Sequence, residues 1–310
     1  MEISIIYKKF RQTIICRGKI FIAIAFLISK NLFAQEEKEF VIGAFRGTQL
    51  INAQTTEMVK PKSFEFSIRH RFGMIGPDST IYEQLLGLDL PANIRFSFTK
   101  PITQWVNISI GRTKDDKTFD ADIKLSILRQ TEDNKSPINL VLFFSTAIKS
   151  ARFPNIPSFA YFADGITPFE YKFNHRLSYI GEIIISRQFS EKIAIQLNPS
   201  WVYKNLVSTG LENEMFILPI GFSIKTGMSS SIVAEYVYRF NNRPSKNQYP
   251  ASIAYEMGTV GHTFQIVISS TSALIQQENF SNNGFDYLKG KFAFGFNINR
   301  TFWKKKKKEN

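Results

Sequence analysis

KFAFGFNINRTFW, residues 291–303, places a large apolar side chain at almost every second position. The apolar set is Phe292, Phe294, Phe296, Ile298 and Phe302, and the positions between hold Lys291, Ala293, Gly295, Asn297, Asn299 and Thr301. A period of two predicts a β-strand with one apolar face. Five lysines, Lys304 to Lys308, follow this strand directly.

The same period recurs along the chain, and no stretch with a helical period competes with it. We predict about twelve strands, at residues 62–72, 93–98, 106–112, 121–127, 139–147, 176–187, 193–203, 214–225, 231–240, 252–257, 262–270 and 291–303. The connections between them alternate regularly between long and short. All tight turns then lie at one end and all long loops at the other, which predicts a closed antiparallel up-and-down β-barrel. This asymmetry is typical of bacterial outer-membrane barrels.

Alternation alone does not decide which solvent surrounds the barrel, because a soluble barrel with an apolar interior shows the same pattern. Three features favour lipid outside and a polar lumen. Twelve strands enclose more space than apolar side chains easily fill. Several strands reach about 10 residues, the length that crosses a bilayer when tilted. Aromatic residues such as Trp201, Tyr203 and Phe240 gather at strand ends, as in interface girdles. The sequence therefore predicts a transmembrane barrel.

The N-terminal residues predict export. A basic region, YKKFRQTIICRGK, precedes the apolar core IFIAIAFLI, and NLFA then supplies Ala34 before Gln35. This order is typical of a secretory signal peptide, so we expect residues 1–34 to be removed by cleavage after Ala34. Residues 35–61 would form a periplasmic or lumenal segment, residues 62–303 the barrel and residues 304–310 a lysine-rich tail. The expected location is the outer membrane.

The net charge of +13 does not indicate nucleic-acid binding, because most of it lies at the two ends of the chain. Residues 1–34 hold six basic residues and one acidic residue, residues 304–309 hold five and one, and +4 remains for the body. The tail is expected to be solvated. Alternatively, Lys304 to Lys308 would contact periplasmic proteins or anionic envelope polymers and headgroups, since each lysine near an anionic surface contributes about 1 kcal/mol.

Several stretches together resemble a family of membrane-attached β-barrels of unknown function from bacteria with two membranes. They are GTQLIN (47–52), IRHRFG (68–73), GLDLPANIRFSF (87–98), ISIGRTKDDKTFDADIKLSILRQ (108–130), AEYVYRF (234–240), GHTFQ (261–265) and GFNINRTFW (295–303). The chain departs from the family at Val260, where a second glycine is usual. The resemblance implies a barrel in contact with membrane lipids and brings no activity with it. In outer-membrane barrels an aromatic closing strand serves as the assembly signal, so the barrel-assembly machinery is an expected partner.

No arrangement of reactive residues predicts an enzyme. The three histidines, His70, His175 and His262, lack metal-ligand spacing, so neither a metal nor a cofactor is expected. The only cysteine, Cys16, lies in the predicted signal peptide. A membrane-embedded hydrolase is the least favoured function, because no serine stands in a nucleophile motif.

The inward faces carry the remaining candidates. The residues predicted to line the lumen are Glu65, Arg69, Arg71, Arg95, Asp122, Lys124, Arg176, Glu182, Glu235 and Arg239. Because acids and bases are mixed, we favour a network that plugs and stiffens the barrel, with the arginines paired to carboxylates such as Glu65 or Glu235. The predicted function is structural, scaffolding or partner-binding, and the alternative is a passive channel for small solutes lined by these charges.

Overall fold

A computed structural model describes residues 39–77, 80–157, 159–162, 164–245 and 248–304 of the protein. The chain divides into two units, Met1–Glu39 and Phe40–Asn310, and the following concerns the second. The predicted signal peptide, residues 1–34, and the lysines at 305–308 lie outside the described residues.

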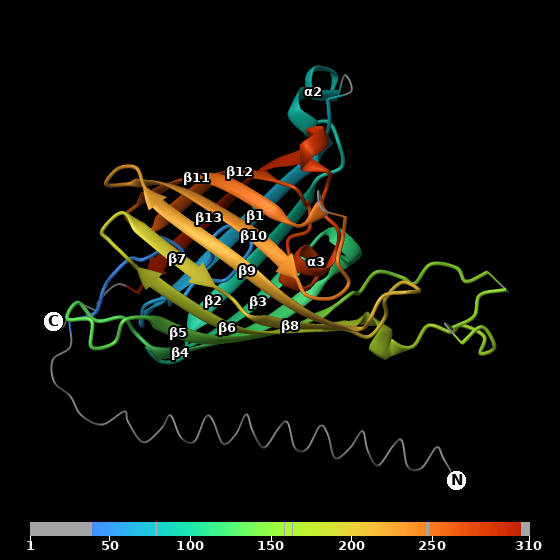
Figure 1. The fold of residues 1–310 in the computed structure, drawn as a ribbon, viewed down its shortest axis with the longest axis horizontal. Helices are drawn as coiled ribbons and strands as arrows, with labels where there is room; N and C mark the ends of the chain where they lie inside the picture. The colour runs from blue at the N-terminus through green and yellow to red at the C-terminus, as the bar shows by residue number, and fades with distance from the viewer. Residues whose placement is uncertain (1–38, 78–79, 158, 163, 246–247, 305–310) are drawn as a thin grey trace, which may run out of the picture. The chain divides into compact units, whose positions relative to one another are not determined.

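The second unit is a single antiparallel sheet that closes on itself (Figure 1). Its strands are β1 (Ser63–Ile75), β2 (Asn93–Pro101), β3 (Val106–Thr113), β4 (Phe119–Leu128), β5 (Asn139–Ile148), β6 (Leu177–Gln188), β7 (Ile193–Leu197), β8 (Ser200–Lys204), β9 (Glu214–Lys225), β10 (Ser230–Arg239), β11 (Ala251–Thr259), β12 (His262–Ser269) and β13 (Phe292–Trp303). Strands that are neighbours in sequence pair with each other, except β7 and β8, and β13 pairs with β1 to close the ring. Residues 291–303 thus contain the closing strand. Phe302 stacks on Phe64 across the β13–β1 seam, with 4.8 Å between ring centroids.

The strands β7 and β8 together occupy one position in the barrel, because both pair with β6 on one side and β9 on the other. The break at Asn198–Pro199 lies opposite Leu218–Pro219. Proline has no N–H to give to a ladder, and each of these two segments contains one proline, so the pairing is interrupted here. The prediction of a twelve-stranded up-and-down barrel is confirmed within the described residues.

Most connections at one end of the barrel are short and most at the other are long (Figure 1). Two depart from this rule, because residues 129–138 at the first end form a longer connection than residues 114–118 at the second. The connections at the second end carry the short helices α2 (Thr80–Glu83), η2 (Leu85–Gly87), η3 (Asp115–Lys117), η4 (Phe173–Arg176), α3 (Gln276–Ser281) and η6 (Tyr287–Lys289). Within the described part of the chain, no helix is long and apolar enough to cross a membrane.

The two faces of the sheet differ as the alternation predicts. Apolar residues such as Ile110 and Ile266 point outward and are 65% and 59% exposed. Charged and polar residues such as Arg71, Glu182 and Ser231 point inward and are buried. An apolar outer band around a polar interior is the arrangement that a lipid bilayer stabilises.

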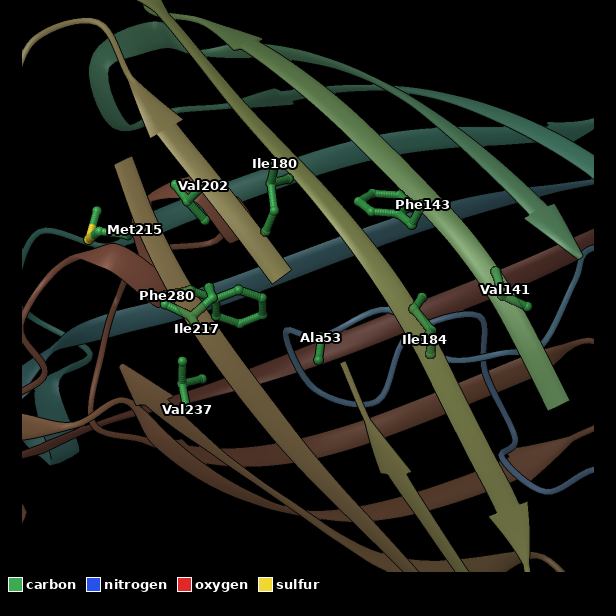
Figure 2. Close-up of a cluster of buried hydrophobic side chains, with 10 residues drawn as sticks. All are labelled: Ala53, Val141, Phe143, Ile180, Ile184, Val202, Met215, Ile217, Val237 and Phe280. Atoms are coloured by element: carbon green, nitrogen blue, oxygen red, sulfur yellow. The ribbon is translucent and has the colours of Figure 1, made fainter. Parts of the chain in front are cut away.

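Two segments outside the strands fill the interior. Residues 43–59, here called the N-terminal plug, contact inward side chains of strands all round the barrel. Residues 271–283, here called the α3 segment, contribute Phe280 to the cluster drawn in Figure 2. Ala53 of the N-terminal plug belongs to the same cluster, which is completed by Val141, Phe143, Ile180, Ile184, Val202, Met215, Ile217 and Val237. The two segments therefore meet inside the barrel.

Candidate functional site

Backbone carbonyls of the N-terminal plug accept hydrogen bonds from amide side chains of the wall. Gln196 Nε2 and Asn198 Nδ2 donate to the carbonyl oxygen of Gln54 at 2.9 and 3.0 Å. On the opposite side, Asn297 Nδ2 donates to the carbonyl oxygen of Ile51 at 3.1 Å. Buried backbone groups need such partners, so the plug takes its hydrogen bonds from the barrel instead of from a sheet of its own.

The tip of the plug is held by Glu235 on β10. Its carboxylate accepts hydrogen bonds from the backbone N–H groups of Ile51, Asn52 and Ala53 at 3.0–3.4 Å. Asn52 Nδ2 also donates to this carboxylate, while Asn52 Oδ1 accepts from Arg71 at 3.1 Å. Asn52 thus lies between the buried arginine and the buried carboxylate, where we expected the two charges to pair directly.

Lys124 on β4 holds the other side of the plug. Its ammonium donates to the carbonyl oxygens of Thr48 and Glu57, both at 2.9 Å, and more weakly to Gln54 Oε1 at 3.3 Å. The Thr48 hydroxyl in turn donates to Glu65 at 2.6 Å. Two predicted lumenal residues, Lys124 and Glu65, therefore bind the plug rather than each other.

Arg95 on β2 forms an ion pair with Asp120 on β4 through two of its nitrogens. Arg95 pairs with a carboxylate, as predicted, but this carboxylate is Asp120 and not Glu65 or Glu235, which the prediction named as examples. Asp120 lies just before the strand predicted at residues 121–127 and was therefore not among the predicted lumenal residues. It precedes Asp122 by two residues and so shares its face. Asp122 lies 3.9 Å from Arg95, and Arg69 is buried beside Arg95 on the neighbouring strand.

At the end with the long connections, Glu182 and Arg239 hold the α3 segment. Gln276 Nε2 donates to Glu182 at 2.8 Å, and Arg239 donates to Asn283 Oδ1 at 2.6 Å and to the carbonyl oxygen of Ser281. Arg176 differs from the other predicted residues, because it ends η4 before β6 begins. Its guanidinium donates to the carbonyl oxygen of Lys149 at 2.8 Å and lies over the ring of Phe153. These partners are residues of the connection after β5.

The binding residues that sequence reasoning missed are mostly neutral amides, namely Asn52, Gln196, Asn198, Gln265 and Asn297. The signal that identifies four of them is position, since Gln196, Asn198, Gln265 and Asn297 lie on the inner side of the wall. An amide can donate to a carbonyl without the cost of burying a charge.

The histidines lie apart from this network. His70 stacks on Phe296 with 5.1 Å between ring centroids, His175 Nδ1 accepts from the Lys172 N–H, and His262 contacts Arg300. Within the described ranges, no three His, Cys, Asp or Glu residues are close enough together to hold a metal ion.

A close approach at Gly221 on β9 makes a first prediction. A Cβ atom there would lie 2.6 Å from Leu50 Cδ2 and 2.7 Å from Gln196 Cγ. Because carbon atoms do not approach this closely without bonding, Gly221→Val is expected to displace the plug locally and to lower the free energy of unfolding by about 1–3 kcal/mol. Urea unfolding in detergent measures this. The matched control is Gly181→Val on β6, where the nearest atom would be 4.0 Å away, and equal losses in the two variants would contradict the prediction.

A second prediction concerns acid stability of the α3 segment. Burial of Glu278 by itself raises the pKa of its carboxyl, but the ammonium groups of Lys204 at 2.7 Å and Lys149 at 3.1 Å outweigh burial and hold the pKa at about 2. A folded-state pKa below the ordinary value of 4.5 means that this ion pairing stabilises the fold above pH 4.5 and is lost as pH falls towards 2. The linkage amounts to about 3 kcal/mol.

Thermal unfolding should therefore shift to lower temperature in the wild type as pH falls through this range. Glu278→Gln should unfold at lower temperature near neutral pH and respond less to acid. Glu132→Gln, on an exposed turn, serves as the control. Parallel pH profiles for Glu278→Gln and the wild type would rule out this role of Glu278.

One family of membrane barrels matches most of the chain. The family model "Membrane bound beta barrel domain (DUF5777)" matches residues 45–302. Among solved structures, the chain is similar to a KdgM porin in complex with disordered oligogalacturonate, at 8% identity and a TM-score of 0.47, over 77% of this chain and 99% of that one. It is also similar to the NanC porin, at 7% identity and a TM-score of 0.46, over 77% of this chain and 100% of that one. No curated protein matches.

Proposed function

This chain belongs to the family of membrane-bound β-barrel domains that matches residues 45–302, and we propose that it is an outer-membrane barrel held shut by its own N-terminal plug. Its role is structural or partner-binding in the cell envelope, with no catalytic step. The observation that supports this is the anchoring of the plug from several sides of the lumen by Lys124, Gln196, Glu235 and Asn297.

Three kinds of interaction oppose an open lumen. The plug buries apolar residues against the wall, with Ala44, Phe45, Leu50 and Ile51 packed on Ala194, Val233, Ala254 and Val267. Its backbone groups are hydrogen-bonded to the wall. Arg46 binds β10 and the turn before it, through Ser231 Oγ at 2.9 Å and the carbonyl oxygen of Met228 at 3.0 Å. Displacing the plug would expose all of these groups at once, which favours one closed state.

The surroundings of the barrel are part of the proposal. Its partners are outer-membrane lipids and the barrel-assembly machinery, with periplasmic proteins or anionic polymers as further partners for the lysines at 304–308. The signal peptide is cleaved after Ala34. The mature chain should fractionate with outer membranes and migrate differently in gels before and after heating, and recovery in the soluble periplasmic fraction would contradict this location.

Conductance of the purified wild-type barrel in a planar bilayer tests the closed state. The expected result is no steady conductance above the bilayer background. Steady ion-selective steps of the wild type would reject the proposal in favour of the passive channel. One observation supports the passive channel: two small polar cavities lie beside the plug, next to Gln49 and Gln54.

A further inference from the structure

The lumen has two unlike sides. The apolar clusters that pack on the two inner segments draw their wall residues from β5–β12. The inward positions of β1–β4 between Glu65 and Ser126 instead carry mostly charged, amide or hydroxyl side chains. Gly111 and Pro101 are among the exceptions. The plug follows this division, because Leu50 packs on the apolar side whereas Thr48 and Gln54 bond to Glu65 and Lys124. Apolar packing excludes water, so water would collect on the polar side.

Two cavities lie on that polar side. One, of about 20 Å³, is lined by Ser67, Ser97, Thr99, Ser109 and Lys124. The other, of about 10 Å³, is lined by Arg69, Arg95 and Asp120 and reaches Gln276 and Gln277 of the α3 segment. Each volume suits about one water molecule in a polar environment. Both cavities touch Gln49, Gln54 and Asp122, so they adjoin along the polar wall.

The charges around the two cavities indicate what they would hold. Three acids, Glu65, Asp120 and Asp122, face three bases, Arg69, Arg95 and Lys124, so neither sign dominates. Arg69 is only 2% exposed, and its Nε has no hydrogen-bond partner among the described residues. A buried donor beside a polar cavity is ordinarily completed by water.

We propose that the β1–β4 wall and the polar side of the N-terminal plug enclose a hydrated tract for water and small inorganic ions, which Gln49 and Gln54 close at its middle. The two residues face each other across the turn of the plug as an isolated bridge pair. Shortening their side chains would join the cavities. The anchoring bonds from Gln196 and Asn198 go to the backbone carbonyl of Gln54 and would remain. This inference rests on the proposed closed barrel, in which the tract is interrupted.

Bilayer conductance of the double variant Gln49→Ala/Gln54→Ala tests the closure. The expected result is a small steady conductance to both K⁺ and Cl⁻, with little preference between them because the lining charges balance. The matched control is Leu50→Ala, which shortens a side chain of the same plug on its apolar side. It should lose stability without conducting. Steady conductance of the wild type would refute the closed barrel. A folded double variant that conducts no more than the wild type would refute closure by Gln49 and Gln54, while the closed barrel would remain supported.

Silver-ion labelling of single cysteines tests hydration independently, in a Cys16→Ser background that leaves no other thiol. Ser97→Cys lies on the polar wall, and Ala254→Cys lies against the plug on the apolar wall; both native residues are buried. The thiol at position 97 should react on the order of tenfold faster or more, because thiol reactivity follows access. Equal protection of the two thiols would overturn the hydrated tract even if the double glutamine variant fails to fold.

Discussion

Replacement of Lys124 by methionine is expected to lower the free energy of unfolding by about 3–5 kcal/mol and to loosen the plug around Thr48 and Glu57. Methionine matches the length of lysine but donates no hydrogen bond. The carbonyl oxygens of Thr48 and Glu57 would lose their lysine donor, and the carboxylate of Glu65 would lose a neighbouring positive charge. A buried charge without compensation costs more than the missing bond itself.

Urea unfolding of the detergent-solubilised barrel measures the loss, and planar-bilayer recordings detect any opening. Lys192→Met on the exposed turn between β6 and β7 removes the same charge and should leave stability unchanged. Should Lys124→Met unfold at the same urea concentration as Lys192→Met, the lysine would not be an anchor of the plug.

The barrel was predictable because its signals are local. Alternation within each strand and the lengths of the connections are properties of short segments, and together they specify an up-and-down sheet. The alternation predicts a single strand over residues 193–203 and does not reveal the break at Pro199. The predicted number of positions in the ring is nonetheless correct.

The filled lumen was not predictable in the same way. Residues 43–59 show no period, and their partners lie far away in sequence, as Asn52 and Glu235 do across 183 positions. One signal was available: the strands 139–148 and 214–225 are apolar on both faces, as in NLVLFF. A strand that is apolar on both faces is buried on both faces. Facing lipid outside, these strands need an apolar partner inside, which Ala53 and Phe280 supply.

Except for Arg176, which precedes β6, the candidate charges lie on the inner faces of the strands as the alternation predicts, but their partners were not predicted. Pairing by charge alone suggested Arg71 with Glu235, whereas Asn52 of the plug lies between them. The side chain that completes such a pair comes from a distant, irregular segment. Sequence alternation carries no information about that segment.

Replacement of Glu235 by alanine is the second large effect that we expect, again about 3–5 kcal/mol. The variant leaves the N–H groups of Ile51, Asn52 and Ala53 without their acceptor and removes the carboxylate that Asn52 links to Arg71. Glu235→Gln keeps one carbonyl oxygen as an acceptor and should lose clearly less. Glu191→Ala, on an exposed turn, controls for the lost charge. Equal losses for the alanine and glutamine variants would mean that the charge, and not the three N–H bonds, holds the tip.

Combining Glu235→Ala with Lys124→Met shows whether the plug is released as one body. The two residues lie on β10 and β4 and hold different parts of the plug, so independent anchors would give additive losses of unfolding free energy. If either change alone frees the whole plug, the second anchor has nothing left to hold. The free energy of unfolding of the double variant should then be about the same as that of the less stable single variant. We expect this second outcome, because the plug forms no sheet with the wall and depends on its anchors together. Additive losses in the double variant, with no conductance, would show instead that each anchor holds its own part of the plug independently while the lumen stays closed.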